Sequence, residues 1–179
     1  MEILENFNLK HFNTFHVSAH GRYFVNATDL TCLRDALAFA NKKEIPFMLI
    51  GQGSNLLFKE DYPGLIIEIN VRGRKLIRED DDTYFVKARC GENWHAFVQW
   101  CLDNKFYGLE NLSLIPGTIG AAPVQNIGAY GVELCDVMVS LDALEIATGE
   151  LKTFTNAECD FSYRNSVFKQ GLKDQYVIY

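Results

Sequence analysis

The sequence lacks the features that mark membrane-spanning, exported and nucleic-acid-binding proteins. No apolar run approaches the roughly 18 residues that a membrane span needs, and the N-terminal stretch MEILENFNLKHFNTF has no apolar core of signal-peptide length. Lysine and arginine (17) are outnumbered by aspartate and glutamate (23), which gives a formal net charge of -6, and no long basic run is present. We therefore expect a cytoplasmic protein that neither enters a membrane nor binds nucleic acid.

The cysteines and histidines exclude two further kinds of site. The five cysteines are odd in number, widely spread and never form a C-x-x-C pair, so neither a disulfide framework nor a zinc site is indicated. His11, His16 and His20 show no arrangement that would hold a metal ion. We expect a reducing compartment and no resident metal.

The first 70 residues predict a small β-α-β-β lobe. Residues 30–40 carry apolar side chains at helical spacing, with Thr28 as the expected cap, Asp29 in the first turn and Pro46 as the stop. A turn is expected at Pro63-Gly64. The expected strands are RYFVNA (22–27), FMLI (47–50) and LIIEI (65–69).

The pattern changes near residue 70, and we expect a second lobe over residues 71–179. An amphipathic helix is predicted in NWHAFVQWCLDNK (93–105), because its apolar residues recur at positions i, i+3, i+4, i+7 and i+8. The acidic run at 79–82 indicates a hairpin turn before the extended stretch YFVKAR. Two more strands are expected around Thr148-Gly149, and DQYVIY (174–179) reads as a last strand.

A loop of small neutral residues, GQGSN (51–55), follows the FMLI strand. Glycine lets the backbone approach a ligand, so successive N–H groups can converge on an anion such as a diphosphate, while Ser54 and Asn55 add donors. A tight turn between strands is the alternative interpretation. The loop lacks the third glycine of a Rossmann fingerprint and the lysine of a P-loop, which disfavours both folds.

A longer stretch, residues 111–132, contains no charged side chain and holds four of the thirteen glycines. Its backbone amides, together with Gln125 and Asn126, could hydrogen-bond a large flat group with polar edges, such as a flavin or a nucleobase. Alternatively, its small residues only let a helix pack closely on a sheet.

Four motifs resemble, in order and spacing, the MurB family of cell-wall flavoenzymes, the UDP-N-acetylenolpyruvoylglucosamine reductases. The motifs are GQGSNLLF, GENWHAFV, GLENLSLIPGTIGAAPVQNIGAYGVEL and FSYRNSVFK, and the resemblance covers nearly the whole chain. It implies an α+β FAD-binding fold of the vanillyl-alcohol oxidase type. Residues 1–70 would form a small FAD-binding lobe and residues 71–179 a second, incomplete one. A third lobe, for the substrate, would lie beyond Tyr179.

The resemblance also implies which residues form the site. Arg164 matches the family's active-site arginine, and Tyr163 would help to hold the substrate. Some members carry serines at the positions of Ala121 and Ala122, so side-chain hydrogen bonds are not expected there. The implied residues for a non-covalent FAD are Gly51, Gln52, Gly53, Ser54, Asn55, Leu56, Pro116, Gly117, Thr118, Gly120, Ala121, Ala122, Gln125, Ile127, Gly128 and Ile178.

The implied activity is the NADPH-dependent reduction of UDP-N-acetylglucosamine enolpyruvate in peptidoglycan precursor synthesis. The family's proton donor and a catalytic glutamate lie in the third lobe, so this chain alone is not expected to turn over substrate at a normal rate. Two alternatives stay open. One is a non-catalytic module that binds FAD or a nucleotide, and the other is an oxygen-using flavin oxidase of the same fold.

Overall fold

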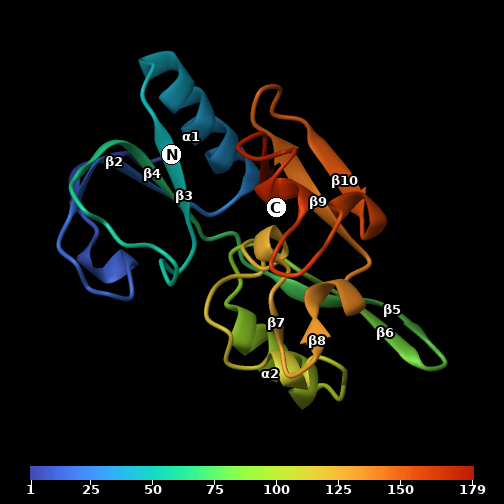
Figure 1. The fold of residues 1–179 in the computed structure, drawn as a ribbon. Coiled ribbons are helices and arrows are strands. Elements are labelled where there is room, and N and C mark those ends of the chain that lie inside the picture. Colours follow the sequence, from blue (N-terminus) through green and yellow to red (C-terminus); the bar gives the residue numbers. More distant parts are fainter. The chain divides into compact units, whose positions relative to one another are not determined.

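The computed structural model describes residues 1–179, which divide into two compact units, Met1–Val71 and Arg72–Tyr179 (Figure 1). No helix in either unit is long and apolar enough to cross a bilayer.

The first unit is a four-stranded mixed sheet with one helix. The strand order is β1-β2-β4-β3. β1 pairs antiparallel with β2, whereas β2, β4 and β3 run parallel to one another. The apolar side chains of β2 and β4 are almost all buried, as expected for parallel strands that are covered on both faces. The strands are β1 (Leu4–Asn8), β2 (His20–Ala27), β3 (Phe47–Ile50) and β4 (Tyr62–Ile69), with a 3-10 turn at Lys10–Phe12.

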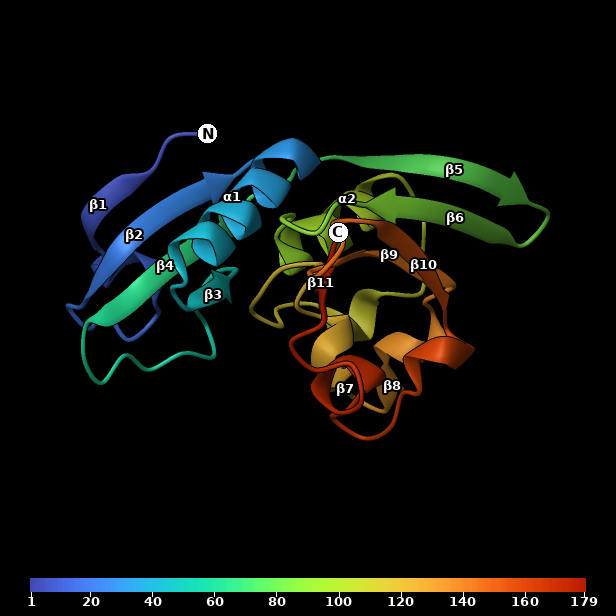
Figure 2. The same cartoon turned by 90° about the horizontal axis from the view of Figure 1, so that it is seen from above.

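The predicted helix of the first unit is present as α1 (Leu30–Lys43), which lies along β2 and β4 (Figure 2). Its cap was predicted one residue too early. Asp29, and not Thr28, has the extended backbone of an N-cap, and its carboxylate accepts the N–H of Cys32 at 2.7 Å. The helix ends at Glu44, which adopts the left-handed conformation.

β4 is longer than the sequence indicated, because Pro63-Gly64 belongs to the strand and forms no turn. Pro63 falls where the register between β2 and β4 shifts, so its missing N–H interrupts a ladder that is already irregular. Gly64 is needed at its position because an added Cβ would lie 2.8 Å from the carbonyl carbon of Pro46. The sequence analysis also missed β1, whose side chains are mostly exposed.

The second unit holds the other predicted elements. α2 (Trp94–Asp103) is capped by Asn93, which accepts the N–H of Ala96 at 2.7 Å, and its apolar stripe faces the core of the unit. Short 3-10 turns connect the rest (Glu110–Leu112, Pro123–Gln125, Leu134–Asp136, Ala157–Cys159 and Val167–Lys169). The strands are β5 (Arg74–Asp80), β6 (Thr83–Ala88), β7 (Gly128–Ala129), β8 (Val132–Glu133), β9 (Ser140–Glu145), β10 (Leu151–Thr155) and β11 (Tyr176–Ile178).

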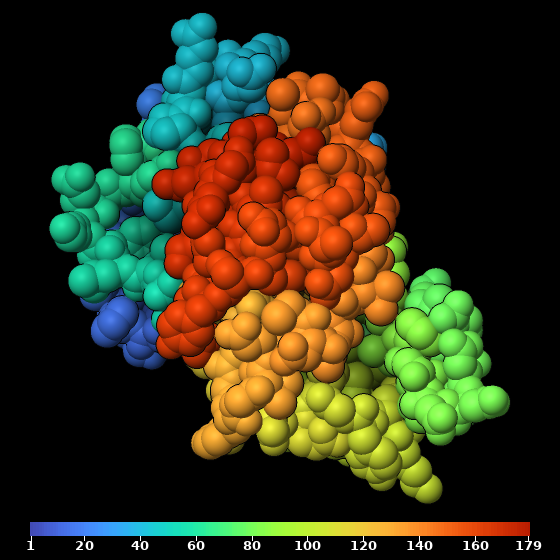
Figure 3. All heavy atoms as spheres, turned by 45° about the vertical axis from the view of Figure 1, so that its right-hand side comes forward, coloured from blue at the N-terminus to red at the C-terminus, as the bar shows by residue number.

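Two arrangements dominate the second unit. β5 and β6 form a hairpin whose turn lies in the acidic run, as predicted, and which projects from the rest of the unit (Figures 1 and 3). β9 lies between β10 and β11, antiparallel to both. This three-stranded sheet confirms the two strands expected around Thr148-Gly149 and the strand expected in DQYVIY.

Candidate functional site

In the first unit, the GQGSN loop begins a connection from the end of β3 to the start of β4. These two strands are parallel neighbours, so residues 51–61 must run back along the sheet before β4 begins. The alternative interpretation, a tight turn between strands, is therefore wrong. The connection is irregular, which leaves its backbone polar groups without the partners that a helix would provide.

Three consecutive backbone N–H groups in this loop have no acceptor within the chain. The N–H groups of Gly53, Ser54 and Asn55 donate no hydrogen bond, and the side chains of Ser54 and Asn55 make none either, although Gly53 is buried. Consecutive backbone N–H groups without acceptors, beside neutral side-chain donors, can bind a phosphate or diphosphate. This set of donors fits the diphosphate of FAD.

Gly53 packs against the backbone of the segment that follows β1. Its φ is +63°, and a Cβ on it would overlap the carbonyl oxygen of Phe12 and lie 2.8 Å from the Cα of Asn13. Its carbonyl oxygen accepts the N–H of Thr14 at 3.2 Å. Only glycine fits this position, because any other residue would be strained at this positive φ and its Cβ would clash with the backbone of Phe12 and Asn13.

The other predicted residues of this loop differ in their surroundings. Gly51 is half-buried and follows the last residue of β3, while Gln52 is exposed. Leu56 packs against the apolar core around Leu9, Phe24 and Ile66. The structure therefore gives Leu56 a packing function that is sufficient to explain it.

In the second unit, the first half of the uncharged stretch is fixed to the segment before α2. The N–H of Ile119 donates to the carbonyl oxygen of Glu92 at 2.9 Å, and that of Gly120 donates to Cys90 at 2.8 Å. A Cβ on Gly120 would lie 2.7 Å from the Cβ of Cys90. Gly120 thus serves close packing against the connection between β6 and α2, and not the packing of a helix on a sheet that the alternative interpretation expected.

The second half of the stretch folds as a compact turn whose apolar side chains enter the core. The N–H groups of Ala121 and Ala122 both donate to the carbonyl oxygen of Thr118 at 3.1 Å. Ala122 and Ile127 are buried in the cluster around α2, whereas Ala121 and Pro116 are exposed. The remaining predicted residues, Gly117, Gln125 and Gly128, are half-buried.

Asn126, which the sequence suggested as a hydrogen-bonding group for a ligand, is satisfied within the chain and organises this region. It is fully buried, and its side-chain nitrogen donates to Glu133 Oε2 at 2.9 Å and to the carbonyl oxygen of Ser162 at 3.2 Å. Its side-chain oxygen accepts the N–H of Cys135 at 3.0 Å. The only sequence signal was its place in the Gln-Asn pair. Asn126 joins the uncharged stretch to the turn that carries Arg164.

Tyr163 and Arg164 form the tip of a tight turn, which is closed by two backbone hydrogen bonds between Ser162 and Asn165. The structure brings Arg164 to Gly128, since Nη2 of Arg164 donates to the carbonyl oxygen of Gly128 at 2.8 Å. The guanidinium also lies 5.9 Å from the centre of the Tyr163 ring, and Tyr163 is 82% exposed. An exposed cation is thereby held at the end of the uncharged stretch.

Ile178 lies elsewhere in the second unit. Together with Tyr179, it lines a cavity of about 920 Å³ bounded by the β5–β6 hairpin, α2 and β9. Of the predicted cofactor residues, this cavity includes Ile178 alone. The structure therefore does not bring Ile178 together with Arg164 and Gly128.

The titratable groups with perturbed pKa values serve packing and ion pairing. Burial raises the pKa of Cys90, Cys101 and Cys159 to about 11. Burial alone would raise the pKa of Asp142, but hydrogen bonds from Lys87 and Thr153 and the charges of Lys87 and Arg89 lower it overall. Lys87 Nζ lies 2.6 Å from the Asp142 carboxylate, in the wall of the cavity.

Comparison with known proteins gives consistent matches. The family described as "FAD binding domain" matches residues 22–155. A UDP-N-acetylenolpyruvoylglucosamine reductase of Flavobacterium johnsoniae is 51% identical over 178 residues, covering 99% of this chain and 52% of the relative. The crystal structure of that reductase (MurB) from Thermus caldophilus superposes with a TM-score of 0.72 at 22% identity, covering 99% of this chain and 59% of that one.

A VAO-type flavoprotein from Myceliophthora thermophila shares the fold more distantly, with a TM-score of 0.58 at 18% identity over 77% of this chain and 27% of that protein. The fold is therefore the α+β FAD-binding fold that the sequence implied. The chain spans about half the length of the curated relatives that it matches.

Proposed function

The chain belongs to the FAD binding domain family, and we propose that it is the flavin-binding portion of a UDP-N-acetylenolpyruvoylglucosamine reductase that acts in the cytoplasm. The complete enzyme would use NADPH to reduce the enolpyruvyl group of UDP-N-acetylglucosamine enolpyruvate. When bound, FAD supplies the hydride chemistry of this reaction. The observation that carries the proposal is the set of unsatisfied N–H donors at Gly53, Ser54 and Asn55.

The two glycine-bearing segments differ in the chemistry that they offer to FAD. In the first unit, the loop from Gly51 to Asn55 holds the diphosphate through backbone N–H groups. In the second unit, the stretch from Pro116 to Gly128 accommodates the uncharged parts of the cofactor. Thr118 and the Gln125 side chain, which makes no hydrogen bond within the chain, are the polar groups for its edges.

Arg164 provides the fixed positive charge of the site. Its planar guanidinium can bind a carboxylate through two parallel hydrogen bonds. Hydride addition to an enolpyruvyl double bond places negative charge next to the substrate carboxylate, and a preorganised cation stabilises that charge. The hydrogen bond to Gly128 orients the guanidinium before substrate arrives, and Tyr163 would hold the substrate beside it.

Two experiments test this function. The purified chain should be yellow and release FAD on denaturation, and a colourless chain that takes up no added FAD would contradict the proposal. In a full-length version, Arg164→Ala should keep its flavin content while enolpyruvyl reduction falls by about 10²–10³-fold, the usual effect of removing one stabiliser of developing charge.

Arg78→Ala is the control for the full-length assay, because it removes another exposed arginine of the second unit that is not among the proposed site residues. It should leave both flavin content and NADPH consumption closer to those of the unaltered enzyme. Unchanged turnover in Arg164→Ala would remove the catalytic function assigned to this arginine.

A further inference from the structure

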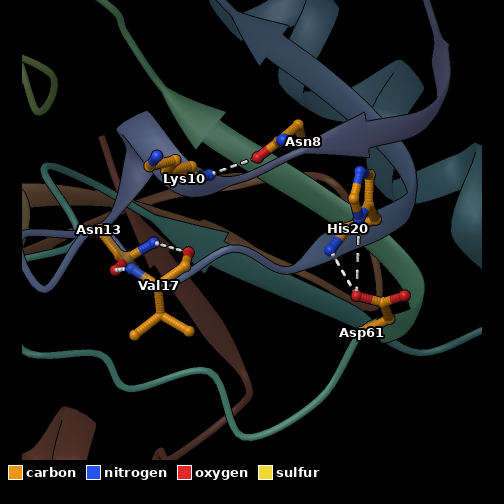
Figure 4. A network of polar contacts seen from close by, with 6 residues as sticks. All are labelled: Asn8, Lys10, Asn13, Val17, His20 and Asp61. Carbon is orange, nitrogen blue, oxygen red and sulfur yellow. Dashed lines mark hydrogen bonds and ion pairs between the residues drawn. The ribbon is translucent and has the colours of Figure 1, made fainter.

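Asn13 is the one buried polar residue of the first unit, with 2% of its surface exposed. Its side-chain nitrogen donates to the carbonyl oxygens of Leu9 at 2.9 Å and Val17 at 3.0 Å, and its side-chain oxygen accepts the N–H of Val17 at 3.0 Å. Figure 4 shows this side chain facing Val17. One amide group thus ties the segment Leu9–Val17 together at both ends.

Residues 12–14 of this segment form the wall of the GQGSN loop, that is, the backbone surface against which Gly53 packs. Phe12 and Asn13 contribute the backbone atoms that leave no room for a Cβ on Gly53, and Thr14 donates its N–H to the Gly53 carbonyl oxygen. The contact joins residues 39 positions apart in the sequence. The conformation of the GQGSN loop therefore depends on how firmly the Leu9–Val17 segment is held.

The hydrogen bond from Thr14 also sets the direction of a donor. No peptide bond in the chain is cis, so the carbonyl of Gly53 and the N–H of Ser54 point in opposite directions across one planar peptide group. Because Thr14 fixes the carbonyl, it fixes the Ser54 N–H to point away from the wall. Gly53, Ser54 and Asn55 make no other backbone hydrogen bond that would orient this N–H.

We propose that Asn13 is a positioning residue for the anion-binding loop. It acts through Thr14 and Gly53 to hold the Ser54 N–H in its binding direction before the diphosphate arrives, which lowers the entropic cost of binding. This inference rests on the proposed function, because it takes the diphosphate of FAD as the ligand. The sequence offered no signal for Asn13, which lies between Phe12 and Thr14 near the N-terminus.

The test compares Asn13→Ala with Leu33→Ala in residues 1–179. Leu33 is fully buried in α1, so its truncation destabilises the same unit without touching the loop or its wall. FAD affinity is measured at a temperature where circular dichroism shows each variant to be folded. Asn13→Ala should bind FAD at least about tenfold more weakly, whereas Leu33→Ala should stay within about twofold of the unaltered chain.

A second variant provides a readout that lost stability alone would not produce. Asn13→Asp keeps the volume of the side chain but replaces two donated hydrogen bonds by a buried carboxyl, whose pKa burial raises. Protonation restores one donor, so its FAD affinity, corrected for the folded fraction, should rise as pH is lowered from 8 to about 5.5. The phosphorus resonances of bound FAD should shift in this variant and not in Leu33→Ala.

A measurement on the unaltered chain needs no variant. FAD should slow hydrogen exchange at the N–H groups of Thr14 and Val17 more than at Cys32, which lies in the first turn of α1. Equal FAD affinity in Asn13→Ala and Leu33→Ala, or unchanged exchange at Thr14 and Val17, would overturn the inference. If the unaltered chain binds no FAD, the proposed function itself fails.

Discussion

Gly53→Ala tests the structure of the GQGSN loop most directly. The substitution adds one methyl group at a position with φ +63°, where the carbonyl oxygen of Phe12 and the Cα of Asn13 occupy the space. The matched control is Gly131→Ala in the β7–β8 turn. Gly131 also has a positive φ, +80°, but nothing lies within 4 Å of an added Cβ.

The two variants share one free-energy cost, and Gly53→Ala carries two further ones. A non-glycine residue in the left-handed region costs about 1–2 kcal/mol in both proteins. Only Gly53→Ala must also open a contact from 2.8 Å to the 3.4 Å at which ordinary van der Waals contact begins, and such overpacking costs about 1–3 kcal/mol. Losing the Thr14–Gly53 hydrogen bond adds about 1 kcal/mol. Gly53→Ala should therefore be about 2–4 kcal/mol less stable than Gly131→Ala.

Urea unfolding followed by circular dichroism measures this difference, and equilibrium titration with FAD measures its effect on binding. Gly53→Ala should bind FAD at least about tenfold more weakly than Gly131→Ala, because the displaced loop no longer directs its N–H groups at one point. Equal unfolding free energies for the two variants would refute the proposed fit of Phe12 and Asn13 against Gly53. Equal FAD affinities would refute the function of the loop.

Two other predictions concern the second unit. Asp142→Asn should lower stability at pH 7 by about 1 kcal/mol. Because folding lowers the pKa of Asp142, the stability that its carboxylate contributes is present above the ordinary aspartate pKa and is lost as pH falls through the lowered pKa. The urea unfolding curves of the variant and the unaltered chain should therefore converge in acid. Burial raises the pKa of Cys90, Cys101 and Cys159 to about 11, so these thiols should react slowly in the folded chain. Labelling with iodoacetamide at pH 8, followed by mass spectrometry, should therefore find Cys32 modified first. Rapid labelling of the three buried cysteines in the folded chain would contradict their placement.

Local sequence patterns predicted both helices and most strands. α2 was predicted because its apolar spacing is helical, and the strands of the first unit were marked by short apolar runs. β1 was missed because its side chains are mostly exposed, which leaves no apolar pattern. The turn expected at Pro63-Gly64 was wrong because a bulge accommodates the proline and the neighbouring Pro46 requires the glycine.

The sequence offers candidate site residues where a motif carries them, and not where a residue's function depends on contacts that form on folding. Arg164 could be singled out from its motif. The bridging functions of Asn13 and Asn126 could not be predicted, because only folding brings together the groups that each side chain joins. An asparagine in a polar segment has no sequence pattern that distinguishes a buried bridge from an exposed side chain.

Glycine content alone is weak evidence for a cofactor site in this chain, since packing against Cys90 explains Gly120 completely. What separates the two glycine-bearing segments is whether their N–H groups have acceptors. In the uncharged stretch, most N–H groups from Ile119 to Ile127 donate within the chain, whereas those of Gly53 to Asn55 donate to nothing. We therefore expect the GQGSN loop to recognise the diphosphate, whereas the uncharged stretch contributes mainly shape. Riboflavin, which has no diphosphate, should consequently bind Gly53→Ala as well as it binds the unaltered chain.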